Sequence, residues 1–270
     1  MHVTAILAVR NERAYLGNCL GHLIENGLDY IVIDNGSTDG AAELLRQPRF
    51  AGSLVDYRTH PYEGAFDWTG LMQAREAAAA EAEADWVLFV SADEIMHSYV
   101  PGETLAQGIE RLSQSGADVI DFNEFVFLPI DHDYASDTPG AQPMLHYYFH
   151  EPGRPRLMRA RRRSLQVSHV AKGGHVLEGA PFQLAQESFA LRHYLFRDQA
   201  HALAKYTGRV FRQDELERGW HRNRVGVEAN RFAFPPTETL HRLAYPEDRA
   251  LRRDTPRMSH YWEDRSEAAV

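Results

Sequence analysis

The sequence contains one cysteine, Cys19, among its 270 residues. A single thiol excludes an internal disulfide and a cysteine-based metal cluster, and this usage is typical of a reducing compartment. No apolar run reaches the ~18 residues that a membrane-spanning helix needs. Residues 1–9 read as a strand and have neither a basic leader nor a cleavage site. We therefore expect a cytoplasmic protein, with peripheral association at the inner face of the membrane as a further option.

Two nucleotide-binding signatures are also missing. The order G-x-G-x-x-G does not occur, and neither does G-x-x-x-x-G-K-[ST]. Their absence argues against a dinucleotide-dependent enzyme and against a P-loop enzyme.

Apolar residues make up 44% of the chain and charged residues 25%, which is ordinary for one large α/β domain or two small ones. The charge is unevenly distributed. Residues 1–150 carry 7 Lys/Arg against 23 Asp/Glu, and residues 151–270 carry 22 against 15. An acidic half could hold a metal and a basic half could meet an anionic substrate, although two solvated surfaces explain the asymmetry equally well.

Hydrophobic periodicity predicts a strand at 2–9, a helix at 15–24, a strand at 30–33 and a helix at 37–45, opened by Ser37-Thr38-Asp39-Gly40. This β-α-β-α opening predicts a parallel sheet. Further strands are expected at 54–57, 86–90 and from 118, with helices at 69–84, 105–113 and 198–217. Residues 127–153, rich in Pro, Gly, Asp and His, are interpreted as a long substrate loop or lid.

Three polar clusters follow predicted strands, at residues 10–12, 34–37 and 91–94. In an open α/β sheet, ligands bind beyond the carboxyl ends of the strands. A single polar cluster after a strand is common, because turns favour polar residues. Three such clusters, each rich in hydrogen-bond acceptors, predict one shared crevice.

The residues of these clusters resemble family 2 glycosyltransferases of the GT-A fold. The matching segments are Val9-Arg10-Asn11-Glu12, Val32-Ile33-Asp34-Asn35-Gly36-Ser37-Thr38-Asp39-Gly40 and Asp85-Trp86-Val87-Leu88-Phe89-Val90-Ser91-Ala92-Asp93-Glu94-Ile95. The resemblance implies a Rossmann-like, mostly parallel sheet flanked by helices, with a C-terminal acceptor-side elaboration. Residues 1–125 would be the nucleotide-sugar-binding half, and residues 126–270 the acceptor-side half and C-terminal helices of one compact domain.

The resemblance also implies roles for single residues. Asn11 and Glu12 would line the nucleoside pocket, Asp34 would accept a hydrogen bond from the base, and Asp93 would bind the metal. The full set of candidate donor-binding residues is Arg10, Asn11, Glu12, Asp34, Asn35, Ser37, Arg75, Ser91, Ala92, Arg197 and Lys205.

A diphosphate is a poor leaving group until its charge is neutralised, and a hard divalent cation on carboxylate ligands supplies that. We expect Mn²⁺ or Mg²⁺ at Asp93. His193 resembles the late histidine that completes the metal site, with His169 and His175 as rivals. Arg197 and Lys205 could face the diphosphate or only cap and solvate a helix. Ser91 stands where the family's motif has its first Asp, which leaves open a non-catalytic, sugar-nucleotide-binding relative.

An inverting transfer needs a carboxylate to deprotonate the acceptor hydroxyl. Glu178 is preferred because it sits in a glycine-flanked loop, and Asp133 is the second candidate. Asp131 and Glu187 are not distinguished from these by their spacing.

The arginines from Arg154 to Arg163 allow several readings: a lipid carrier, an anionic membrane surface, an anionic glycan, or a solvated strand pair. Nucleic acid is not expected. The sequence thus predicts a metal-dependent glycosyltransferase that uses a nucleotide-sugar donor, UDP-linked by resemblance, and a glycan, lipid-linked or other hydroxyl acceptor. Two competing functions stay open: a nucleotidyltransferase, and a scaffold of a glycan assembly complex.

Overall fold

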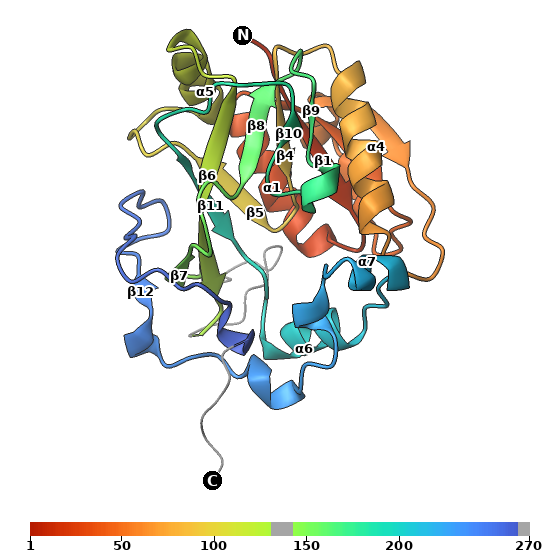
Figure 1. Cartoon of the computed structure of the whole chain (residues 1–270), viewed down its shortest axis with the longest axis vertical. Helices are drawn as coiled ribbons and strands as arrows, with labels where there is room; N and C mark the ends of the chain where they lie inside the picture. The colour runs from red at the N-terminus through yellow and green to blue at the C-terminus, as the bar shows by residue number, and fades with distance from the viewer. Residues whose placement is uncertain (131–142, 264–270) are drawn as a thin grey trace.

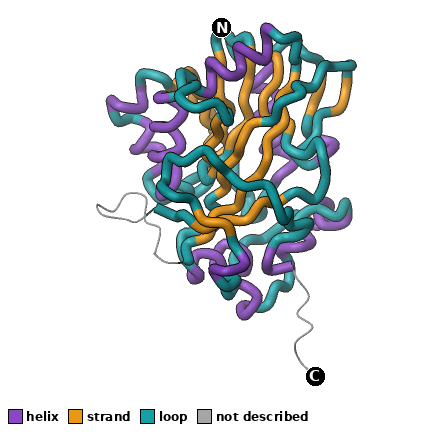
Figure 2. The backbone as a smooth tube through the Cα atoms, turned by 90° about the vertical axis from the view of Figure 1, so that its left-hand side faces the viewer, coloured by secondary structure: helices purple, strands orange, loops and turns teal. Residues whose placement is uncertain are grey.

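The computed structural model describes residues 1–130 and 143–263. One ten-stranded mixed sheet runs through these residues, with helices on both of its sides (Figure 1, Figure 2). The strand order is β12-β7-β6-β8-β4-β1-β2-β3, and β11 joins β5 to β6.

The first half of the sheet is parallel. It consists of β1 (Val3–Val9), β2 (Asp29–Asp34), β3 (Leu54–Thr59) and β4 (Trp86–Val90), with β1 between β2 and β4. Strands β1, β2 and β4 are buried almost throughout, because helices cover both faces of the sheet and demand apolar residues on each.

Alternate residues of these strands meet different helices. Leu7 and Val9 of β1 pack in the cluster that holds α1 (Arg13–Glu25), α2 (Ala41–Leu45), α3 (Pro48–Ala51) and α5 (Leu105–Gln114). Ile6 points the other way, into the cluster with Ala78 and Ala79 of α4 (Trp68–Glu81). The two-residue period of the strands therefore fixes which helix lies on which face.

The second half of the sheet is mixed. Strand β8 (Met158–Arg162) runs antiparallel between β4 and β6 (Val119–Leu128), so it joins the two halves into one sheet. Strand β11 (Phe189–His193) is parallel to β6 and antiparallel to β5 (Glu94–His97). Strand β7 (His146–His150) is antiparallel to β6 and to β12 (His241–Arg242).

The remaining elements are short. Strands β9 (Val167–Ser168) and β10 (Glu178–Gly179) form a separate pair. Helices α6 (Gln199–Thr207) and α7 (Gln213–Glu217) follow β11. The 3₁₀ turns are Val170–Lys172, Arg222–Arg224, Ala229–Phe232, Thr237–Thr239 and Tyr261–Glu263.

The parallel opening and the mostly parallel, helix-flanked architecture predicted from the sequence are confirmed. Two element predictions are wrong. Residues 127–153 are not loop throughout, because β6 continues to Leu128 and β7 occupies His146–His150. The helix predicted at 198–217 is two helices, because the chain leaves α6 at Gly208 and the Val210 carbonyl accepts a hydrogen bond from Phe66 N at 2.7 Å.

The arginine run predicted as a surface or ligand-binding segment is only partly exposed: Arg154 and Arg163 face solvent, whereas the other four are buried or half-buried. Arg159 and Arg161 on β8 are buried, and they pair with Glu94 at 2.9 Å and Glu76 at 2.8 Å. Arg162 pairs with Asp118 at 3.0 Å. Because breaking a buried pair leaves an uncompensated charge, these contacts tie β8 firmly to α4 and to the start of β5.

Across residues 1–130 and 143–263, no helix has both the length and the apolar character needed to cross a membrane.

Candidate active site

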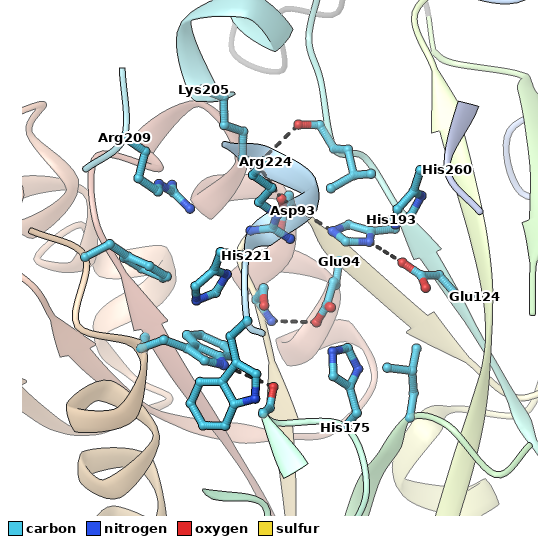
Figure 3. A pocket seen from close by; sticks show the side chains of 18 of the residues that line it. Asp93, Glu94, Glu124, His175, His193, Lys205, Arg209, His221, Arg224 and His260 are labelled. Atoms are coloured by element: carbon cyan, nitrogen blue, oxygen red, sulfur yellow. Dashed lines mark hydrogen bonds and ion pairs between the residues drawn. The ribbon is translucent and has the colours of Figure 1, made fainter. Parts of the chain in front are cut away.

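A cavity of about 500 Å³ lies at the carboxyl ends of β1 and β4. The ends of both strands contribute to its wall, through Val9, Arg10, Glu12 and residues 91–94. Two of the three polar clusters predicted to share one crevice, at 10–12 and 91–94, therefore contribute to this cavity, whereas none of residues 34–37 is among its lining residues. Side chains from the second half of the sheet and from α6 complete it, among them Glu124, His193 and Lys205 (Figure 3).

Asp93 is the carboxylate at the centre of the cavity wall. Its Oδ2 atom accepts a hydrogen bond from Lys205 Nζ at 2.9 Å and lies 3.6 Å from His193 Nε2. Burial alone would raise the pKa of Asp93, but the Lys205 ammonium and His193 hold it well below its usual range. Asp93 is therefore ionised wherever the protein is folded at neutral pH, as a metal ligand requires.

His193 is oriented by a second carboxylate. Its Nδ1 atom lies 2.6 Å from Glu124 Oε1, which turns Nε2 toward Asp93 (Figure 3). Arg156 in turn pairs with Glu124. Burial lowers the pKa of His193, but Asp93 and Glu124 raise it to about 9. Without a metal His193 is therefore protonated at neutral pH, and a metal at Nε2 would have to displace that proton. An imidazole held by a carboxylate at its other nitrogen is the usual arrangement at metal-binding histidines.

These residues fit a divalent metal with an open coordination sphere. Asp93 offers a carboxylate and His193 an oriented imidazole, a donor set compatible with Mn²⁺ or Mg²⁺. In the part of the chain that the structure describes, no three His, Cys, Asp or Glu side chains gather as a metal-binding group. A metal at Asp93 would therefore depend on the diphosphate and on water for its other ligands.

Glu94, next to Asp93, has both oxygens engaged. Its Oε2 accepts from the Ser91 backbone N at 2.7 Å, and its Oε1 accepts from Arg159 Nη2 at 2.9 Å. Glu94 therefore shapes the turn after β4 that presents Ser91, Ala92 and Asp93 to the cavity.

The loops after β1 and β2 are fastened to each other. Asn11 adopts φ 54, a left-handed conformation that Asn tolerates better than most residues. There its Oδ1 accepts from Thr38 N at 2.7 Å, while its own backbone N donates to Ser37 Oγ at 3.0 Å. Asn11 and Ser37, both predicted donor-binding residues, thus join the first two sequence motifs into one surface.

Arg10 makes a similar connection. Its Nη1 donates to the carbonyls of Asn35 at 2.7 Å and Gly36 at 2.9 Å, and its guanidinium stacks on the Tyr62 ring at 3.3 Å. The side-chain Nδ2 of Asn35 donates to the carbonyls of His60 and Pro61. Arg10 lines the cavity, whereas Asn35 supports the loop behind it.

Asp34, the last residue of β2, is buried. Its Oδ1 accepts from Ser37 N at 3.0 Å, and its Oδ2 accepts from the Tyr57 hydroxyl at 2.8 Å. Burial and Asp34 together raise the pKa of Tyr57 to about 12. Asp34 therefore closes the turn that carries the second motif and is not among the residues that line the main cavity.

The model of the glycosyl transferase family 2 matches residues 4–174, which contain this whole constellation of strand ends. The chain belongs to glycosyl transferase family 2.

A curated relative is the lipopolysaccharide core biosynthesis glycosyltransferase LpsC of Rhizobium meliloti (strain 1021), 30% identical over 92 residues. That match covers 34% of this chain, and the chain spans about a third, 32%, of the length of LpsC.

Two solved structures give weaker matches. The S. aureus TarS fragment 1–349 in complex with UDP is 15% identical, with a TM-score of 0.45 over 73% of this chain and 61% of that one. The mannosyltransferase PcManGT of Pyrobaculum calidifontis, in complex with GDP-Man and Mn²⁺, is 22% identical, with a TM-score of 0.34 over 48% of this chain and 36% of that one.

Two further predicted site residues of this family 2 chain, Arg75 and Arg197, are not among the residues that line the cavity with Asp93. Arg75 is buried and donates to the carbonyls of Ile6 at 3.2 Å and Val90 at 3.3 Å, so it braces β1 against β4. Arg197 lines a second cavity of about 330 Å³ together with Asn11 and Glu12. Glu12 thus borders both cavities.

The two candidates for the catalytic base stay predictions. Glu178 lies exposed on β10 and pairs with Lys172 at 2.8 Å; it is not among the residues that line the main cavity. Asp133 lies outside the described residues. The rivals to His193 behave differently: His169 is held between Glu76 and the Met158 carbonyl, whereas His175 lines the cavity.

Sequence reasoning missed an aromatic wall. Phe66 and Trp68 come from the start of α4 and the segment before it, and Phe211 and His221 come from the segment around α7; all four line the cavity. Phe211 stacks on His221 with ring centroids 4.7 Å apart, and Phe66 stacks on Trp68 at 5.7 Å. Scattered aromatic residues have no spacing that marks a shared site, since only the fold brings these segments together.

Proposed function

We propose that this chain transfers a sugar from a nucleoside-diphosphate sugar, UDP-linked in the first instance, to a hydroxyl acceptor. The observation that carries the proposal is the placing of Asp93 and His193: one ionised carboxylate and one carboxylate-oriented imidazole face each other in a cavity at the strand ends. Membership of glycosyl transferase family 2 supports the same reaction class.

In this proposal Asp93 and His193 hold Mn²⁺ or Mg²⁺. The bound cation would supply charge neutralisation for the departing diphosphate. Glu124 keeps the His193 ring in place, and Glu94 fixes the turn that carries Asp93. Arg10, Asn11 and Ser37 would present the joined surface of the first two loops to the nucleoside, and Asn35 would hold that surface in shape. Asp34 would accept a hydrogen bond from the base as well as close the turn before Ser37.

The aromatic wall favours a sugar in the same cavity. Phe66, Trp68 and Phe211 offer flat apolar faces beside polar groups, a combination typical of small-molecule sites. LpsC acts in lipopolysaccharide core biosynthesis, and we propose a glycan or lipid-linked saccharide as the acceptor here also. Residues 1–125 would then serve mainly the donor and residues 126–270 mainly the acceptor.

We also propose inversion at the transferred sugar, a carboxylate as the catalytic base, and a cytoplasmic location for the protein. An inverting reaction needs a carboxylate at the acceptor hydroxyl, and Glu178 and Asp133 are the residues proposed for it. A cytoplasmic location with peripheral membrane contact would draw on the exposed arginines of the run, Arg154 and Arg163, because Arg159 and Arg161 are buried in ion pairs.

One observation favours a second candidate. Ser91 supplies no charge beside Asp93, and Lys205 already neutralises Asp93. A sugar-nucleotide-binding relative without turnover would have both features.

Thermal unfolding of the purified protein with UDP, GDP, dTDP or CMP, each with and without Mn²⁺, tests the donor class. A ligand that binds only the native state raises the melting temperature. We expect one nucleoside diphosphate to raise it in a Mn²⁺-dependent way. No shift with any nucleotide would contradict the proposed donor. Binding of the nucleotide sugar without release of the nucleoside diphosphate would favour the non-catalytic candidate.

A further inference from the structure

Two arginines in the cavity, Arg209 and Arg224, make no hydrogen bond or ion pair to a carboxylate of residues 1–130 or 143–263. Glu12 and Asp93 nonetheless lie close enough to Arg209 to influence its pKa. Their neighbours are aromatic: the Arg209 guanidinium lies 4.6 Å from the Phe66 ring centroid, and that of Arg224 lies 5.5 Å from the Tyr206 ring centroid. Other arginines of the cavity wall, Arg156 and Arg159, have Glu124 and Glu94 as partners.

The unpaired arginines concentrate positive charge at one place. Burial and the neighbouring Arg224 lower the pKa of Arg209 against the opposing effect of Glu12 and Asp93, and burial with both arginines lowers the pKa of His221 to about 4. In Figure 3 the side chains of Lys205, Arg209 and Arg224 converge on the space beside Asp93. Holding like charges together away from water is costly unless an anion compensates them.

The segment that carries these arginines is firmly attached. Phe66 N donates to the Val210 carbonyl at 2.7 Å, directly after Arg209. Glu215 is fully buried, and its Oε1 accepts from Thr69 N at 2.6 Å in the first turn of α4. A carboxylate at the N-terminus of a helix is well placed because it meets free N–H groups and the positive end of the dipole. Glu215 therefore holds residues 209–224 over the cavity.

We propose that Arg209 and Arg224 form the subsite for the diphosphate of the donor, opposite Asp93. Their planar guanidinium groups match the paired oxygens of phosphate groups, which Lys205 contacts less specifically. Lys205 is occupied by Asp93 and by the Leu195 carbonyl at 3.2 Å, and Arg197 lines the other cavity. The phosphate contacts predicted for Arg197 and Lys205 are thus reassigned to two arginines further along the chain. This inference rests on the proposed function, since it names the part of the donor that the arginines bind.

The test is isothermal titration of the full chain with inorganic pyrophosphate, a probe that does not depend on the nucleoside. Arg209→Gln and Arg224→Gln are compared with Arg212→Gln, an exposed arginine of the same segment that pairs with Asp214 at 3.0 Å. We expect each cavity variant to lose at least tenfold in affinity and Arg212→Gln to lose less than twofold. The lysine variants Arg209→Lys and Arg224→Lys should each show a smaller loss than the corresponding glutamine variant. Melting temperatures of the ligand-free variants identify any that fail to fold, and the lysine variants then carry the comparison.

Three results would overturn the subsite: no measurable pyrophosphate binding to the unaltered protein, equal binding by the double Gln variant, or an equal loss in Arg212→Gln. A nucleoside diphosphate that binds together with pyrophosphate, without competition, would also overturn it, because the anion would then belong to the acceptor. The proposed function fails separately. If the arginine variants weaken pyrophosphate binding but no nucleoside diphosphate binds more tightly than pyrophosphate, the anion subsite stands and the donor class does not.

Discussion

Lys205 Nζ on α6 donates to Asp93 Oδ2 after β4 at 2.9 Å, which connects residues 112 positions apart in the centre of the cavity. The contact makes the C-terminal helix part of the site that the first half of the chain builds. It also means that the carboxylate proposed to hold the metal already has a cationic partner.

Replacing Lys205 by Met is expected to destabilise the ligand-free protein. Removing one partner of a buried ion pair lowers the free energy of unfolding by roughly 3–5 kcal/mol. We expect a loss near the lower end of this range, because His193 still lies beside Asp93. Mn²⁺ should restore part of the stability, because a metal can replace the lost cation. Chemical denaturation with and without Mn²⁺ measures both effects.

The matched control is the double variant Asp93→Asn, Lys205→Met, in which neither charge remains. It should be more stable than Lys205→Met alone and indifferent to Mn²⁺. If Lys205→Met unfolds at the same denaturant concentration as the unaltered protein, the pair contributes nothing to the fold.

Glu215→Gln tests the attachment of residues 209–224. The amide can still accept from Thr69 N, but it loses the charge that favours this bond at a helix N-terminus. We expect a loss of about 1 kcal/mol in the free energy of unfolding and faster proteolysis within residues 209–224. Glu217→Gln, on the same helix, should change neither quantity. Unaltered proteolysis of Glu215→Gln would mean that the segment is held by its aromatic contacts alone.

Asp34→Ala is expected to weaken nucleoside diphosphate binding by roughly 1–3 kcal/mol, the range for a charged hydrogen bond. Tyr57→Phe is the structural comparison, because it removes only the hydroxyl that donates to Asp34. Titration calorimetry should find Tyr57→Phe close to the unaltered protein. Equal affinity of Asp34→Ala would limit Asp34 to closing the turn before Ser37.

Glu12 makes stability depend on pH. Burial raises its pKa from the ordinary 4.5 to about 6, although Lys205 opposes the shift. The folded state therefore binds the proton more tightly than the unfolded state, and the free energy of unfolding falls as pH rises from about 4.5 to about 6. Above that window the ionised, buried Glu12 costs roughly 1–2 kcal/mol.

Glu12→Gln removes this cost without changing the side-chain size. We expect the variant to be more stable than the unaltered protein at pH 7 and equally stable at pH 4, by denaturant titration at both values. A difference that is the same at the two pH values would show that Glu12 does not titrate in this window.

The site residues that the sequence could predict are those that lie just after the C-terminal end of a strand. Arg10 directly follows one apolar run and Asp93 lies three residues after another, and parallel strands bring their carboxyl ends together. His193 can be predicted only through family resemblance, and nothing in the sequence indicates that Glu124 orients it, because that contact depends on β6 and β11 pairing in parallel.

The arginines show most clearly what a sequence leaves undetermined. Arg159 and Arg161 form part of a conspicuous charged run, yet their partners Glu94 and Glu76 lie 65 and 85 positions earlier, so sequence could not reveal that they are buried and paired. Arg209 and Arg224 stand in a segment without a recognisable motif, and tertiary contacts such as those with Phe66 and Thr69 bring them to the cavity. Whether an arginine has a carboxylate partner is decided by the fold. That difference is what distinguishes Arg159 and Arg161, which are paired, from Arg209 and Arg224, which are proposed to bind the ligand.

The most direct test of the central claim is the release of nucleoside diphosphate from UDP-, GDP- and dTDP-linked hexoses, with Mn²⁺, by the unaltered protein and by Asp93→Asn. We predict Mn²⁺-dependent release from one donor class and a loss of roughly 100-fold or more in Asp93→Asn, the scale of removing one group that stabilises developing charge. Undiminished release by Asp93→Asn would contradict the assignment of Asp93 as the residue that holds the metal at the donor.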